Sequence, residues 1–127
     1  MFFPRRTKYI FGKDKIKKEG IKNVDAILAF PGNPKIPINT VHIFMCDVLH
    51  HVANREAWLK TLSGEVKKGS KLSIIEFKPG KLPEGPPDEI KIPAEQIILM
   101  VKEAGFRLLK RDGDLLPYQT YFLFEKL

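Results

Sequence analysis

The chain has 127 residues, of which 43% are hydrophobic and 29% charged, which suits one compact domain with a buried core, and its net charge is +7. A single cysteine, Cys46, excludes an internal disulfide and any metal site built on several thiolates. The sequence has no apolar run long enough to span a membrane, and the MFFPRR start does not read as a secretory signal, so a cytoplasmic location is expected.

Most of the net charge lies in the first 23 residues, which we treat as a separate basic segment preceding a domain over 24–127. This segment contains eight basic and two acidic residues, which gives it a net charge of +6. The basic residues are Arg5, Arg6, Lys8, Lys13, Lys15, Lys17, Lys18 and Lys22. Such a segment either binds phosphate or is the solvated face of a short helix. The helix is favoured, because aromatic residues such as Tyr9 and Phe11 have no spacing typical of base stacking.

Two apolar runs follow the basic segment and predict strands. The first covers residues 24–30 and ends in the loop PGNPKIP. The second covers residues 41–48 and has almost no polar positions, which predicts a strand buried on both faces, as in a parallel sheet. Asn54 is then a plausible N-cap for a helix that ends near Gly69.

The second half of the chain repeats this order. A buried strand is predicted over 71–77, followed by a long loop rich in proline and glycine over 78–93. Pro93 suits the first turn of a second helix, for which Gly105 is the C-terminal cap. Strands over 106–112 and 121–127 complete the chain. Alternating strands and helices indicate an α/β fold.

The segment from Ile43 to Gly80 resembles the middle of class I S-adenosylmethionine-dependent methyltransferases of type 11. It contains Asp47 at a strand end, then Leu49, His50 and His51, a Lys68–Gly69 turn and the Ile-Ile-Glu-Phe strand at 74–77. EQIILMVKEAGF and LPYQTYFLFEKL are similar to the family's next helix and last strand. The resemblance, over residues 21–127, implies a truncated Rossmann-like sheet that is mostly parallel, has an antiparallel C-terminal strand and carries helices on its faces.

The departures from the family concern its cofactor. The family holds S-adenosylmethionine with a D-x-G-x-G-x-G loop, in which glycine allows close approach of the backbone, and these 127 residues contain no such loop. The family's ribose-binding acidic residue has no clear counterpart. Asn33 stands where the family commonly has an aspartate near the adenine. The resemblance therefore implies a reduced cofactor site.

The expected site lies beyond the carboxyl ends of the strands, where open α/β sheets bind ligands. The resemblance implies that His50 and Asp47 are catalytic, with His50 as a general base, while His51 is expected to pack under the loop. It assigns the cofactor to Asn33, Met45, Cys46 and Asp47, and the substrate to His51, Glu76, Lys78, Tyr118 and Gln119. The alternatives are a surface ion pair for Glu76 and Lys78, and packing on the sheet for Tyr118.

A metal site is not expected, although Cys46 and His50 are four residues apart. Strand side chains alternate, so Cys46 and Asp47 should point to opposite faces, and no second cluster of ligands is present.

Three functional hypotheses remain open. The first is a methyltransferase-like domain for a small-molecule acceptor, inactive as a lone monomer or completed by a partner or a dimer. Leu99 and Met100 hint at a contact surface for such an assembly. The second is a non-catalytic module that contacts an anionic partner through the basic segment, with nucleic acid the less favoured case. The third is a complete enzyme with an unfamiliar cofactor loop.

Overall fold

A computed structural model describes the backbone of residues 5–127 and the side chains of residues 10–127. Its elements, in chain order, are α1 (Arg5–Lys18), β1 (His42–Cys46), a 3-10 turn (Leu49–His51), α2 (Arg55–Gly64), β2 (Lys71–Phe77), a second 3-10 turn (Asp88–Ile90), α3 (Ala94–Glu103), β3 (Phe106–Asp112) and β4 (Gln119–Lys126).

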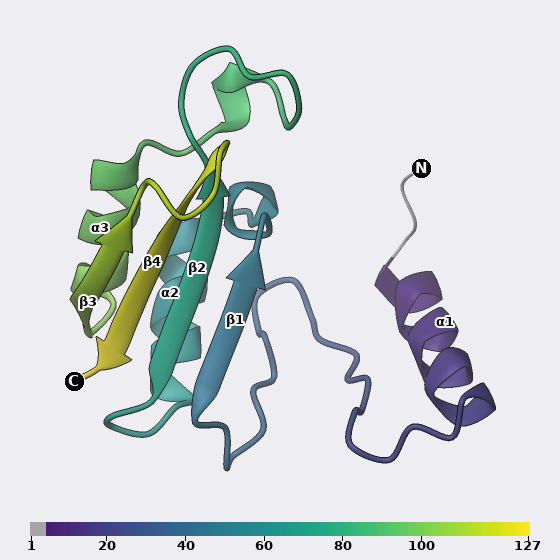
Figure 1. Ribbon diagram of the computed structural model, residues 1–127. Helices are drawn as coiled ribbons and strands as arrows, with labels where there is room; N and C mark the ends of the chain where they lie inside the picture. Colours follow the sequence, from purple (N-terminus) through teal and green to yellow (C-terminus); the bar gives the residue numbers. More distant parts are fainter. Residues whose placement is uncertain (1–4) are drawn as a thin grey trace.

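The strands form one four-stranded mixed sheet in the order β1-β2-β4-β3 (Figure 1). β1 pairs parallel with β2, and β4 lies antiparallel to both β2 and β3. Three strands therefore run in one direction and the C-terminal strand runs against them, which confirms the predicted α/β sheet. The carboxyl ends of β1 and β2 and the start of β4 lie at the same end of the sheet.

Helices α2 and α3 pack side by side on one face of the sheet (Figure 1). The core forms there, between the alternate strand residues that point to this face and the apolar sides of both helices. Its fully buried members include Leu59, Leu72, Ile97, Phe122 and Phe124. The opposite face carries no helix in the described part of the chain, and the Phe44 side chain on it is 63% exposed.

Two strand predictions are corrected by the structure. Residues 24–30 form no strand, and the bridge between Phe30 and Asn33 is an isolated one outside the sheet. The segment has the apolar composition of a strand, but it is not one of the four strands of the described sheet. Residues 42–46 do form a strand, yet not one buried on both faces, because β1 is at the edge of the sheet and only Met45 in it is buried.

The helix predictions hold with two adjustments. α2 begins after Asn54 but ends at Gly64 rather than near Gly69, and Asn54 makes no side-chain cap hydrogen bond, because its backbone is left-handed with φ 52°. α3 follows Pro93 and ends before Gly105, as predicted. Gly105 has φ 108°, and a Cβ atom there would lie 3.1 Å from the hydroxyl of Ser63, so this turn favours glycine.

Candidate functional site

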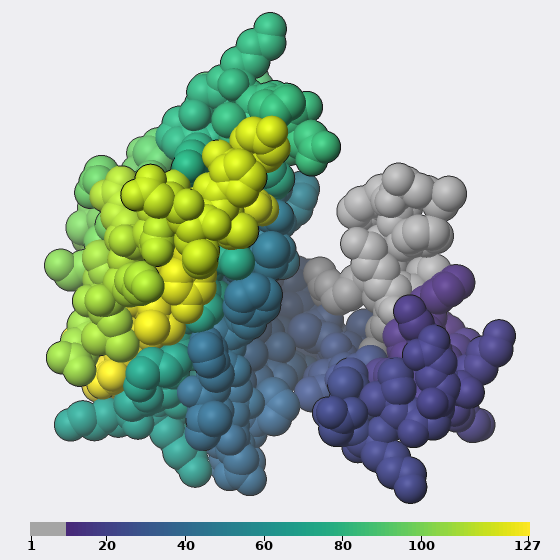
Figure 2. Space-filling view, viewed as in Figure 1, coloured from purple at the N-terminus to yellow at the C-terminus, as the bar shows by residue number. Residues whose placement is uncertain are grey.

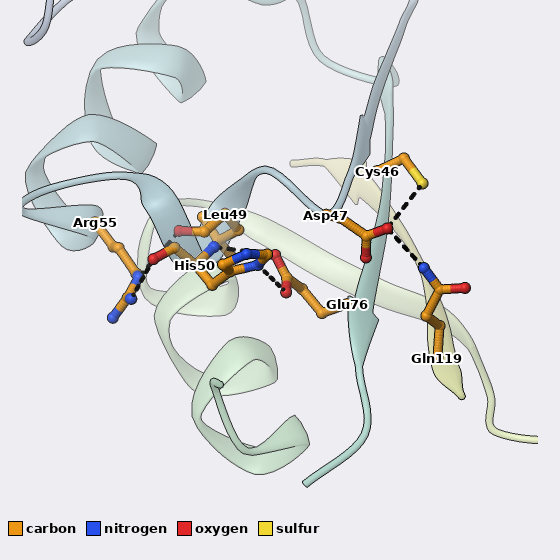
Figure 3. A network of polar contacts seen from close by, with 7 residues as sticks. All are labelled: Cys46, Asp47, Leu49, His50, Arg55, Glu76 and Gln119. Carbon is orange, nitrogen blue, oxygen red and sulfur yellow. Dashed lines mark hydrogen bonds and ion pairs between the residues drawn. The ribbon is translucent and has the colours of Figure 1, made fainter. Parts of the chain in front are cut away.

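Five of the predicted site residues are brought together where the ends of β1 and β2 lie beside the start of β4 (Figure 3). Cys46 ends β1 and Asp47 follows it, His50 lies in the 3-10 turn, Glu76 is near the end of β2, and Gln119 begins β4. The backbone N–H of Asp47 donates to the carbonyl of Ile75 at 2.9 Å, which extends the β1–β2 ladder by one residue before the chain turns. Residues far apart in the sequence thus form one polar cluster.

His50 and Glu76 form the buried half of this cluster. The side chains are only 3% and 2% exposed, and the Nδ1 atom of His50 lies 2.8 Å from a carboxylate oxygen of Glu76. The other carboxylate oxygen accepts the backbone N–H of His50 at 3.0 Å. The space beside Glu76 is about 10 Å³, roughly the volume of one water-sized probe. In this arrangement Glu76 therefore holds the turn against β2.

The two histidines are placed the opposite way from the expectation. His50 is the buried histidine, while His51 is exposed and its ring lies 4.1 Å from that of His50, measured between centroids. The 3-10 turn explains this, because it directs His50 toward the sheet, where Glu76 provides a partner, and His51 toward solvent.

Arg55 is a site residue that the sequence analysis missed. Its guanidinium donates to the carbonyl oxygens of Leu49 and His50, each at 3.0 Å, and so fixes the other side of the turn (Figure 3). The available signal was an arginine in the first turn of the helix that follows Leu-His-His. A cation at this position pairs the carbonyl of His50 and gives the carbonyl of Leu49 a second donor, in addition to the N–H of Val52 at 3.0 Å.

Asp47 forms the more open half of the cluster. Gln119 donates from Nε2 to the Oδ2 atom of Asp47 at 2.7 Å, and the thiol of Cys46 donates to the same oxygen at 3.7 Å. The other oxygen, Oδ1, is buried and has no hydrogen-bond partner among the described residues. An unpaired buried acceptor is costly, so Oδ1 is the atom of this cluster best suited to accept a hydrogen bond from a ligand.

The contact between Cys46 and Asp47 corrects the predicted alternation. Asp47 has a left-handed backbone, with φ 57°, and this interrupts the strand geometry that would place the two side chains on opposite faces. Desolvation raises the pKa of the Cys46 thiol above its usual value, and the Asp47 carboxylate raises it further. Within residues 10–127, no three His, Cys, Asp or Glu side chains are placed to hold a metal ion.

The remaining predicted site residues lie outside the cluster's hydrogen bonds. Lys78 does not pair with Glu76, and its ammonium instead donates to the carbonyls of Leu116 and Pro117, at 3.4 and 3.3 Å. Tyr118 is exposed, and its carbonyl accepts the backbone N–H of Lys78 at 2.9 Å.

Two of the predicted cofactor residues serve the fold in this structure. Met45 is buried in the core. Asn33 lies in a local turn, where its side-chain oxygen accepts the backbone N–H of Lys35 at 2.9 Å.

Comparison with known proteins shows what this geometry is similar to. No protein-family profile matches the sequence, and no curated protein matches it. A methyltransferase from Aquifex aeolicus superimposes with a TM-score of 0.82 at 24% identity, over 94% of this chain and 63% of that one. The chain has the fold of part of a class I methyltransferase. It spans less than two thirds of that neighbour's length.

Two further neighbours show the range of chemistry on this fold. NcsB1, an O-methyltransferase from neocarzinostatin biosynthesis solved with S-adenosylhomocysteine and 1,4-dihydroxy-2-naphthoic acid, gives a TM-score of 0.76 at 13% identity, over 94% of this chain and 39% of that one. The [4+2]-cyclase SpnF gives 0.69 at 18% identity, over 84% and 42%. The fold alone therefore does not fix the reaction.

The side of the polar cluster away from β2 is bounded by no strand of the described sheet. β1 is an edge strand, so the side of Asp47 and Cys46 away from β2 has no neighbouring strand. The sequence contains no glycine-rich loop that would bring backbone N–H groups close to a nucleotide there. The cluster offers a ligand side-chain acceptors, among them the Oδ1 atom of Asp47.

No described helix is both long and apolar enough to cross a membrane.

Proposed function

We propose that this chain is an S-adenosylmethionine-dependent methyltransferase-like domain with a reduced cofactor site, inactive as a lone monomer and completed by a partner or a dimer. The observation that supports this proposal most is that a chain with a methyltransferase-like fold ends its sheet at β1. A cofactor site beside Asp47 would need a further strand on that side. The methyl acceptor is then a small molecule, and the location is the cytoplasm.

The polar cluster supports this proposal by its chemistry. Because Glu76 engages Nδ1 of His50, Nε2 is the nitrogen left to take a proton from an acidic acceptor. Asp47 offers its unpaired Oδ1 to the cofactor, beside Cys46 and Met45. The methyl acceptor would bind at the same end of the sheet, beside His51, Lys78, Tyr118 and Gln119. Methyl transfer requires mainly alignment of the reactants, which makes binding the decisive step.

Isothermal titration with S-adenosylmethionine and S-adenosylhomocysteine tests the proposal, with light scattering to fix the mass. We expect no binding in the micromolar range by the isolated chain. Micromolar binding would contradict the reduced site and would support a complete enzyme with an unfamiliar loop. In that case His50→Ala and Asp47→Asn would show which residues serve the reaction.

The basic segment over 1–23 favours a second function, that of a module contacting an anionic partner. Helix α1 ends in Lys15, Lys17 and Lys18, all exposed. The side chains of Arg5, Arg6 and Lys8 lie outside the described residues. Replacing those three by alanine should abolish binding to a nucleic acid probe, with a salt-dependent loss, if this function is correct. Affinity that survives the replacement would count against it.

A further inference from the structure

We propose that the open face of the sheet binds single-stranded nucleic acid, whose bases stack on aromatic rings gathered around Ser73. The open face is the side of the sheet opposite α2 and α3. This inference goes beyond the proposed function, because it requires neither a methyl acceptor nor S-adenosylmethionine.

Alternation along the strands decides which side chains reach the open face. Leu72, Ile74 and Phe122 are buried in the core under the helices, so the residues that alternate with them point to the other side. In Figure 1, α2 lies behind β2 and β4, so the open face is turned toward the viewer. Figure 2 shows from the same side that atoms of all four strands reach the surface, with none of the described helices over them.

Two rings converge on the Ser73 hydroxyl from the neighbouring strands. Nε2 of His42, from β1, lies 2.7 Å from the Oγ atom of Ser73, and the hydroxyl of Tyr121, from β4, lies 3.1 Å from the same atom. His42 pairs with Lys71 in the register and Tyr121 pairs with Ile75, so each ring reaches a diagonal neighbour on β2. Such side chains lie along the sheet rather than upright. The two rings therefore cover Ser73, which is only 1% exposed.

Phe44 supplies a third ring beside these two. It is directly opposite Ser73 in the register and is 63% exposed. His42 precedes it by two residues on the same side of β1, at a separation of about 7 Å. Exposed aromatic rings on a four-stranded sheet are the surfaces on which single-stranded bases stack. The three rings thus form a platform for bases, which we call the ring platform.

The charges on the open face suit a phosphate backbone. Lys71 and Arg107 both pair with Glu125, each at 3.1 Å, and the ammonium of Lys110 lies 3.8 Å from a carboxylate oxygen of Asp112. Three cations therefore meet two carboxylates. The cationic side chains are 38–59% exposed, against 24% and 25% for the carboxylates, so an approaching ligand meets the cations first. The net charge of +7 adds a long-range attraction for a polyanion.

A polymer fits this face better than a single nucleotide. The rings lie on the flat face of a sheet, so they offer a base one stacking surface rather than an enclosed pocket. A strand adds the contributions of successive bases and phosphates, which a free nucleotide lacks. A duplex keeps its bases stacked on one another, so their faces are not available to the platform. The ring platform therefore favours single strands.

Fluorescence anisotropy with the full 127-residue chain tests this inference. The probes are labelled oligouridine and oligothymidine of about 12 nucleotides, a length within the usual site size of such surfaces. We expect saturable binding at low salt, at least about tenfold tighter than that of a duplex of the same length, as expected for the loss of one stacked base. Comparing the two probes shows whether the sugar matters. Equal binding of the duplex would overturn base stacking, and competition by uridine monophosphate at about 100-fold excess would overturn the polymer in favour of a nucleotide site.

Variants of Phe44 identify the ring platform. Phe44→Leu keeps an apolar side chain but removes the ring, and it should weaken binding by about 5- to 100-fold, which corresponds to one stacked base. Phe44→Tyr keeps the ring and should bind as the parent chain does. Phe11→Leu is the matched control, because Phe11 is a 71% exposed phenylalanine on α1, away from the open face. Circular dichroism checks the fold of each variant, and parental affinity of folded Phe44→Leu would overturn the platform.

Salt dependence identifies the phosphate contacts. Lys110→Gln removes one cation from the open face and should lower the slope of log affinity against log salt by about 0.7, the value for one phosphate of a single strand. Lys102→Gln is the control, because Lys102 is exposed on α3, on the other side of the sheet. Equal slopes for the two variants would contradict a phosphate contact at Lys110.

The basic segment is the competing explanation for nucleic-acid binding, and one variant separates the two. In a chain with Arg5, Arg6 and Lys8 replaced by alanine, Phe44→Leu should still weaken binding by the same factor. Loss of all binding in the triple variant, with no effect of Phe44→Leu in the parent chain, would assign binding to the basic segment and overturn this inference. Titration of the same samples with S-adenosylmethionine decides the methyltransferase proposal independently, because neither result depends on the other.

Discussion

Removing the Glu76 carboxylate is expected to be one of the most destabilising single changes in this chain. Glu76 is 2% exposed and accepts from both the backbone N–H and the Nδ1 atom of His50. Glu76→Leu leaves both donors buried without an acceptor, because the adjoining space is too small to admit more than about one water. The Leu49–His51 turn then loses its attachment to β2.

The magnitude follows from the two hydrogen bonds. Each bond to a carboxylate contributes about 1.5–3 kcal/mol, so Glu76→Leu should lower the free energy of unfolding by about 3–5 kcal/mol. Glu76→Gln keeps one acceptor oxygen and should lose about half of that. A typical domain has only about 5–15 kcal/mol in total, so the leucine variant should approach the limit of folding.

Urea unfolding followed by circular dichroism measures this loss. With a slope of about 1–3 kcal/mol per molar urea, the midpoint should fall by more than about 1 M for Glu76→Leu. Glu103→Gln, an exposed glutamate on α3, is the control and should shift the free energy by less than about 0.5 kcal/mol. Stability of Glu76→Gln and Glu76→Leu within that same margin would refute a structural role for the buried pair.

Three further predictions concern the Cys46–Asp47 contact, the turn after β3 and the start of α2. Asp47→Asn should lower the pKa of Cys46, by removing the second cause of its elevation after desolvation, and thiol alkylation near pH 8 should become faster; an unchanged rate would contradict the contact. The N–H groups of Asp114 and Leu115 lower the pKa of Asp112, so its contribution to stability is present above the unfolded pKa of about 4 and is lost as pH falls through the folded value. Acid titration of Asp112→Asn should therefore show a smaller stability loss below about pH 4 than the parent chain, and an equal loss would count against these bonds. Asn54→Gly should be neutral or stabilising because the backbone is left-handed there, whereas Asn54→Ala should cost about 1–2 kcal/mol in thermal unfolding; the reverse order would refute this assignment.

Helix α3 offers fewer apolar side chains for assembly than the sequence predicted. Leu99 is 58% exposed on α3, but Met100 is 9% exposed and belongs to the core. The two are adjacent on a helix, about 100° apart around its axis, so one of them turns toward the sheet. Of these two residues, only Leu99 is available to a contact surface on α3.

Local pattern in the sequence was sufficient for most elements. The strand over 71–77 and the strand over 106–112 are found with the same bounds, because each is a β-branched or apolar run flanked by turn residues. Helix α3 is bounded by Pro93 and Gly105, whose backbone preferences act within one turn. Such signals depend on neighbours in the sequence, so no tertiary information is needed to detect them.

Pairing and burial were decided only by the tertiary structure. Residues 24–30 have a strand's composition but do not join the four-stranded sheet, and β1 has the composition of an interior strand but lies at an edge of that sheet. The polar cluster likewise depends on Gln119 reaching Asp47 across 72 positions and Glu76 reaching His50 across 26. Sequence patterns report the preferences of a segment, whereas hydrogen-bond partners and exposure depend on which segments the fold brings together. The sequence therefore determined most of the helices and strands of this chain. The tertiary structure determined which strands pair, which side chains are exposed, and which side chains form the polar cluster.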